Sequence, residues 1–110
     1  MSWDVAVHAD VDGNPVYLAD WNYTHNCNGM ANEVLGQDGP SWYRRLDGLE
    51  GAAAAALLHQ ILFGLNANPQ HFRAMNPDNG WGDFDSFRAR LEEMAAVAEK
   101  FPSSQWSASG

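Results

Sequence analysis

The stretch WDVAVHADVDGNPVYLADW, residues 3–21, decides the fold. Two runs enriched in valine, tyrosine and tryptophan flank the segment Asp12-Gly13-Asn14-Pro15. Asp-Gly and Gly-Asn steps accept the positive φ angles that a tight turn between antiparallel strands requires. We therefore expect a β-hairpin with strands near residues 3–10 and 16–23. A two-stranded ribbon is only marginally stable by itself, so its apolar face must pack on other elements.

The chain that follows has the periodicity of helices. Its first apolar residues fall at i, i+3, i+4, i+7 and i+8, the spacing of one buried helical face. They are Cys27, Met30, Ala31, Val34 and Leu35. We expect a helix over residues 25–35, with Thr24 as its N-cap and Gly36 as its terminator. Cys27 then faces the core, where a free thiol usually serves as an apolar filler.

A long, alanine-rich helix is predicted from residue 46 or 49 to residue 65, and its wide apolar surface makes it the central helix. We assign its buried stripe to Leu49, Ala53, Leu57, Ile61 and Leu65. Gly51 and the alanines after it have so little side-chain bulk that another backbone can approach there. His59 is expected to be a hydrogen-bonded interior or boundary histidine. An aspartate at Leu57 should unfold the domain.

Two more helices complete the predicted domain. Asn68-Pro69 has the pattern of a helix start, and Asp83 or Asp85 can cap the last helix. Residues 103–110 are small and polar, so we expect a flexible tail unless the indole of Trp106 docks. The prediction is one α+β domain over residues 1–102, in which an N-terminal antiparallel β-hairpin packs on about four α-helices.

Charge and length limit the classes of function. A chain of 110 residues with a formal net charge of −8 is a single acidic domain. This charge repels nucleic-acid backbones and anionic membranes, so we expect no direct binding to either. The N-terminal residues lack the pattern of a signal peptide, and no apolar run is long enough to span a bilayer. We expect a soluble cytoplasmic protein.

The stretch WNYTHNCNGM, residues 21–30, overlaps the end of the second predicted strand and is the first candidate binding surface. His25, Asn28 and Asn32 lie at i, i+3 and i+7 of the predicted helix, so they form a polar stripe apart from its apolar face. Such a row beside free N-terminal amides can hold a polar or anionic ligand. The alternative is that Thr24, Asn26 and Asn28 only cap and solvate the helix start.

The loop over residues 76–83 is the second candidate surface. It places Trp81 between two glycines in a run of turn-forming residues, with Asn79 two positions earlier. Indole side chains are seldom left idle in solvent. Trp81 therefore either plugs the core or joins Asn79 in a binding surface.

Metal and cofactor motifs fail in this sequence. Asp10, Asp12 and Asn14 occupy three places of a calcium loop, but Pro15 and Trp21 stand where that loop needs glycine and a bidentate glutamate. The chain has no zinc, phosphate-loop or dinucleotide motif. We expect no metal and no cofactor, and a non-enzymatic role is favoured over an enzymatic one.

Two patterns suggest relatives. YTxNxxxM at residues 23–30 and NPxNGWG at residues 76–82 resemble uncharacterised small proteins of actinobacteria and their phages. The resemblance extends from the hairpin to the last helix, and NPxNGWG is its most specific part. It implies a common fold and a phage-accessory role, but it assigns no activity and no site residue.

Three functions stay open at this point. The favoured one is a non-enzymatic recognition protein that binds a small polar ligand or a host protein. Its predicted contact residues are His25, Asn26, Asn28, Asn32, Asn79 and Trp81. The second is an acidic inhibitor that mimics nucleic acid in the basic site of a host protein. The third is a small hydrolytic or transfer enzyme. The sequence leaves the oligomeric state open and allows a homodimer.

Overall fold

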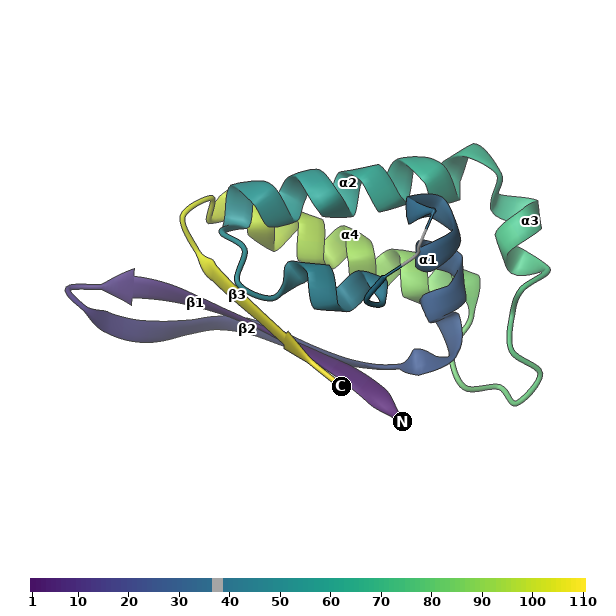
Figure 1. Cartoon of the computed structure of the whole chain (residues 1–110), viewed down its shortest axis with the longest axis horizontal. Helices are drawn as coiled ribbons and strands as arrows, with labels where there is room; N and C mark the ends of the chain where they lie inside the picture. Colours follow the sequence, from purple (N-terminus) through teal and green to yellow (C-terminus); the bar gives the residue numbers. More distant parts are fainter. Residues whose placement is uncertain (37–38) are drawn as a thin grey trace.

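Three antiparallel strands form one layer of the protein and the helices form the other (Figure 1). The computed structural model describes residues 1–36 and 39–110. In chain order the elements are β1 (Ser2–Val11), β2 (Asn14–Thr24), the 3₁₀ helix η1 (His25–Cys27), α1 (Asn28–Leu35), the 3₁₀ helix η2 (Trp42–Leu46), α2 (Gly51–Ala67), α3 (Pro69–Arg73), α4 (Phe84–Lys100) and β3 (Gln105–Ser109). The strand order is β2-β1-β3, so the predicted α+β class with an N-terminal hairpin is confirmed.

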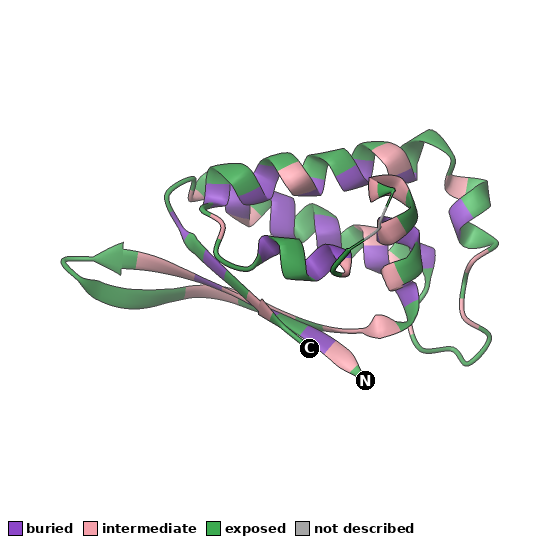
Figure 2. Cartoon of the chain, viewed as in Figure 1, coloured by how far each residue is buried: buried purple, intermediate pink, exposed green. Residues whose placement is uncertain are grey.

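The hairpin turns where the sequence predicts. Asp12 and Gly13 have φ angles of 54° and 83°, which is the two-residue turn that matches the twist of antiparallel strands. The strand register shifts between Val7 and His8, which marks a β-bulge. Beyond this bulge the ribbon extends past the helices, and its end is exposed on both faces (Figures 1 and 2).

The two faces of the sheet differ because successive side chains of a strand point to opposite sides. Trp3 and Val5 of β1 and Trp106 of β3 are buried against the helices. Asp4 and Ala6, which alternate with them on β1, lie on the open face. The sheet therefore has one apolar face in the core and one polar face that none of the helices in residues 1–36 and 39–110 covers.

The helical layer is built around α2, which packs against α4 and α1. Its buried residues are Gly51, Ala54, Ala55, Leu58, Ile61, Leu62 and Leu65. A Cβ atom on Gly64 would lie 2.4 Å from Cγ1 of Val34, so the crossing of α1 and α2 requires glycine there. Within the described residues, every helix is too short or too polar to cross a bilayer.

The predicted stripe of the central helix is wrong in part. Ala53 is exposed and Leu57 is half-buried, whereas the adjacent Leu58 is fully buried. Nearly every position of α2 is apolar, so the sequence pattern does not determine which side faces the core. His59 forms a hydrogen bond, as expected, but it is exposed and pairs with Glu99 of α4 instead of lying in the interior.

The predicted cap and terminator of the first helix and the predicted cap of the last helix are confirmed, whereas α2 runs from Gly51 to Ala67 and so begins and ends later than the predicted range of 46 or 49 to 65. The Thr24 hydroxyl accepts a hydrogen bond from the Asn26 amide (3.2 Å), and Gly36 ends α1 in the left-handed region with φ 61°. Asp83 caps α4 through a reciprocal capping box with Ser86. These local signals succeed because each depends on residues close together in sequence.

Within residues 103–110, where the sequence predicts a flexible tail unless Trp106 docks, the indole does dock and residues Gln105–Ser109 form the third strand. β3 pairs antiparallel with β1, and Trp106 is 2% exposed. The turn before it lies against the start of α2, where the Gly51 amide donates to the Ser104 carbonyl (2.9 Å). A Cβ atom on Gly51 would come 2.1 Å from the Phe101 carbonyl oxygen. The sequence predicts that another backbone can approach closely at Gly51. The structure has this close approach, and it places β3 beside the sheet.

Candidate functional site

The loop before α4 presents an exposed indole. Trp81 is 70% exposed, so it does not plug the core. Its amide donates to the side-chain oxygen of Asn79 (2.9 Å), which forms a local turn. The side-chain amide of Asn26 donates to the Trp81 carbonyl (3.2 Å) and to Asn79 Oδ1 (3.3 Å). These bonds tie the loop to η1 across more than fifty residues of sequence.

The glycines on either side of Trp81 hold the loop close to the sheet. Gly80 and Gly82 have φ angles of 75° and 85°, which side chains rarely adopt. A Cβ atom on Gly82 would lie 2.7 Å from Cγ2 of Thr24 and 2.9 Å from the hydroxyl of Tyr23. The backbone thus packs directly on the end of β2. This contact fixes the backbone next to Trp81.

A hollow of about 490 Å³ lies beside the indole. Its lining residues come from β1, β2, η1 and the loop before α4. They are Met1, Ser2, Asn22, Thr24, Asn26, Asn79 and Trp81. These side chains supply amides, hydroxyls and one large ring, and none of them carries a formal charge. Amides and hydroxyls both donate and accept, so the hollow suits an uncharged polar molecule. We call this set of residues the indole site.

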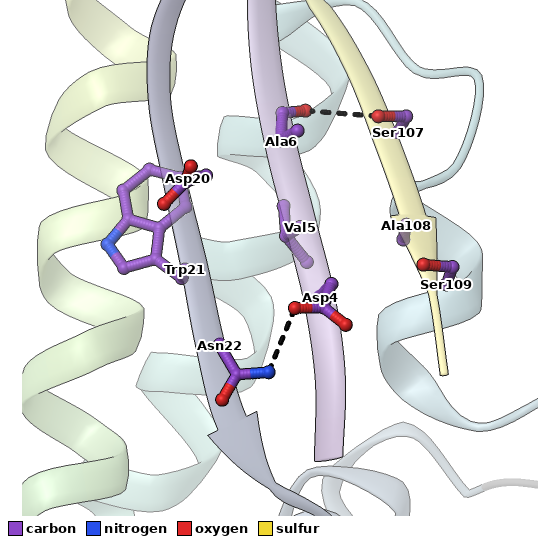
Figure 3. A pocket seen from close by; sticks show the side chains of 9 residues that line it. All are labelled: Asp4, Val5, Ala6, Asp20, Trp21, Asn22, Ser107, Ala108 and Ser109. Carbon is purple, nitrogen blue, oxygen red and sulfur yellow. Dashed lines mark hydrogen bonds between the residues drawn. The ribbon is translucent and has the colours of Figure 1, made fainter.

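A second hollow, of about 320 Å³, lies on the open face of the sheet (Figure 3). It is lined by Asp4, Val5, Ala6, Asp20, Trp21, Asn22, Ser107, Ala108 and Ser109. Asn22 borders both hollows. Its amide donates to Asp4 Oδ1 (2.8 Å) and to the Ser2 hydroxyl (3.0 Å), and Figure 3 shows the first of these bonds between β2 and β1.

The six predicted contact residues divide into two groups. Asn26, Asn79 and Trp81 come together in the indole site. The stripe of His25, Asn28 and Asn32 faces η2 instead of an open hollow. The predicted stripe therefore exists as a row, but its side chains contact protein.

The asparagines of that row position a buried tryptophan. Asn28 Oδ1 accepts from the Trp42 indole (2.9 Å), and Asn32 Oδ1 accepts from the Trp42 amide (2.9 Å). The ring of His25 stacks on that of Tyr43 with centroids 5.6 Å apart. Trp42 is fully buried, so its indole N–H needs an acceptor inside the fold. These bonds give Asn28 and Asn32 a structural role.

Sequence analysis missed the strand residues that border the two hollows. The predicted contact residues do not include Ser2, Asp4, Asp20 or Asn22, although Asn22 belongs to the stretch WNYTHNCNGM. A signal was present, because these polar residues alternate with apolar ones and so share the face away from the core. The alternation does not predict that this face lies close to Trp81, because that proximity depends on the tertiary fold.

Two ionisable side chains behind the indole site, Cys27 and Tyr23, favour their neutral forms. Burial raises the pKa of the Cys27 thiol and that of the Tyr23 phenol. Cys27 is 1% exposed, which fits the predicted apolar filler better than a nucleophile. The described part of the chain contains no group of three or more histidine, cysteine, aspartate or glutamate side chains placed to hold a metal.

Comparisons with known proteins add no relative. No family model, no curated protein and no solved structure matches the chain.

Proposed function

We propose that this protein is a non-enzymatic recognition domain that binds a small, uncharged, hydroxyl-rich ligand, such as a sugar, at the indole site. One observation carries the proposal: an exposed indole, on a backbone fixed by hydrogen bonds to Asn26 and Asn79, borders a hollow lined by amides and hydroxyls. A sugar ring has an apolar C–H face and a rim of hydroxyls. The indole matches the first and the amides match the second.

The indole site is suited to binding because little order has to be created when a ligand arrives. The loop is already joined to η1 through Asn26 and seated on β2 through Gly82. A pre-positioned surface loses less conformational entropy on binding than a mobile one. The uncharged side chains of the lining, most of them amides and hydroxyls, also favour a polar uncharged ligand.

The test is a titration of the full chain with neutral tetrasaccharides of glucose, mannose and N-acetylglucosamine. We expect at least one to shift the tryptophan fluorescence and the side-chain amide signals of Asn26 and Asn79. Trp81→Ala should abolish this binding and leave the melting temperature unchanged. Phe63→Ala is the matched control, because Phe63 is an exposed aromatic residue (81%) on the distant helix α2. Full affinity in Trp81→Ala, or no binding of any tetrasaccharide, would contradict the proposal.

An acidic inhibitor is the second candidate. The hairpin carries four aspartates, Asp4, Asp10, Asp12 and Asp20, and neither of its strands contains a lysine or arginine. Such a surface attracts a basic partner through its charge more than through its shape. Binding to a basic DNA-binding protein should then weaken steeply with salt and fall in an Asp10→Asn/Asp12→Asn variant. Salt-independent binding would remove this candidate.

A phage-accessory role and a cytoplasmic location are part of the same proposal. The phage-accessory role derives from the NPxNGWG resemblance. Sugar recognition is compatible with an accessory protein because it requires no catalytic group.

A further inference from the structure

We infer that the ligand is a neutral oligosaccharide, because the indole site adjoins the hollow on the open face of the sheet and Asn22 lines both; we call that second hollow the groove. This inference rests on the proposed function and extends it from one sugar ring to a chain of rings. The two hollows share Asn22, so a molecule that stacks on Trp81 can continue past Asn22 onto the strands.

The register of the sheet builds the groove from two rows of side chains. Asn22, Asp4 and Ser109 stand opposite one another on β2, β1 and β3, and Asp20, Ala6 and Ser107 form the next row. Three strands span about 9–10 Å, which gives room for more than one sugar ring. Each row therefore offers hydrogen-bonding groups along the length of a chain.

The chemistry of the rows suits a sugar. The carboxylates of Asp4 and Asp20 accept hydrogen bonds, and the Ser107 and Ser109 hydroxyls both donate and accept. Ala6 lies between them with only a methyl group, so the C–H face of a ring can rest on it. Ser107 already donates to the Ala6 carbonyl (3.5 Å), as drawn in Figure 3.

The same carboxylates set the charge of the ligand. The ion pairs found among the described residues all join side chains of the helical layer, so they leave Asp4 and Asp20 without a basic partner. An acidic sugar chain would therefore meet two uncompensated charges in the groove. A neutral chain avoids that repulsion.

Chain length provides the test. The probes are the one-, two-, three- and four-ring members of whichever tetrasaccharide in the panel above binds most tightly, measured by calorimetry with the full chain. We expect affinity to rise at least tenfold from one ring to four. The uronic-acid tetramer of polygalacturonate should bind at least tenfold more weakly than the neutral one.

Filling the groove should remove the gain from chain length. We expect Ala6→Tyr to bind the tetrasaccharide no more tightly than the single sugar and to leave single-sugar affinity unchanged. Gln105→Tyr is the matched control, because Gln105 is an exposed residue opposite His8, in the next row of the same face and outside this groove. The Gln105→Tyr variant should keep the full rise in affinity from one ring to four. If Ala6→Tyr does not fold, Ser107→Tyr fills the same hollow from β3.

The outcomes separate the two proposals. Binding that requires Trp81 but does not change with chain length, or a gain that survives in the groove-filled variant, overturns the oligosaccharide inference and leaves the indole site intact. Absence of binding by every neutral sugar overturns the proposed function, and the inference with it.

Discussion

The two faces of the sheet use alternate residues of the same strands and differ in almost every physical property. The inner face carries large rings, such as Trp3, Tyr23 and Trp106, that pack on the helices. The open face carries short polar side chains, such as Asp4 and Ser107. The inner face supplies the apolar burial that stabilises the domain. The open face can therefore keep short side chains and a hollow, even though larger side chains there would bury more surface.

We expect the largest difference in stability between the two faces when adjacent residues of β1 are substituted. Val5→Asp would place an unpaired carboxylate in the core, where Val5 is 1% exposed. Its cost of several kcal/mol approaches the roughly 5–15 kcal/mol stability of a whole domain, so we expect an unfolded protein. Ala6→Asp, one residue later, should stay folded and lose about 1 kcal/mol or less. Circular dichroism and urea unfolding of the two variants would show this.

The difference in unfolding free energy between an inner-face and an open-face substitution should be smaller on β3 than on β1. Trp106→Ala removes an indole that stacks on Trp21 and donates to the Ser104 hydroxyl, so we expect a loss of about 3–5 kcal/mol in unfolding free energy. Ser107→Ala, on the open face, should change it by about 0.5 kcal/mol or less. Equal effects of the two substitutions in urea unfolding would refute the assignment of faces.

The strand that carries Trp106 also shows where sequence analysis reaches its limit. The hairpin could be predicted because its turn residues and its two strands are neighbours in sequence. β3 has only Trp106 and Ala108 as apolar residues, and it pairs with β1 about one hundred residues away. So short an alternation does not differ from a polar tail until its partner strand is known.

The candidate site was predictable to a similar extent. Asn26 and Trp81 were each recognised as part of a candidate surface, but only the fold brings the two surfaces together. The row containing Asn28 and Asn32 was placed correctly on its helix. These asparagine side chains point into the protein because they accept hydrogen bonds from the amide and indole of Trp42. A helical pattern does not reveal such partners.

A phenol on the inner face gives a third, pH-dependent comparison. Burial raises the pKa of Tyr23 above its ordinary value, and its hydroxyl is 2.6 Å from that of Ser86. In alkaline solution the unfolded chain ionises this phenol first, so stability is retained below about pH 10 and falls as pH rises further. Tyr23→Phe should cost about 0.5–1.5 kcal/mol at neutral pH through loss of the hydrogen bond. It should also make the alkaline decline shallower.

The Tyr23 experiment compares urea unfolding at pH 7 and pH 11 for the parent and the variant. Tyr17→Phe is its control at pH 7, since Tyr17 is 60% exposed near the free end of the hairpin. It should leave neutral-pH stability within about 0.5 kcal/mol of the parent. A Tyr23→Phe variant with the parent's alkaline decline would show that another group controls it.

The smallest expected change in unfolding free energy is a gain instead of a loss, and it comes from a substitution at the centre of the open face. Threonine suits a strand better than alanine, so Ala6→Thr should raise the unfolding free energy by a few tenths of a kcal/mol, up to about 1. The added methyl and hydroxyl would occupy the space over Ala6 where we place a sugar ring, so tetrasaccharide affinity should fall while single-sugar affinity stays the same. Ser109→Thr makes the same kind of addition at the end of β3 and should lower affinity less. If Ala6→Thr proves both more stable and equally competent for the long ligand, then the small residue at position 6 does not serve binding, and the open face differs from the inner one only in its exposure.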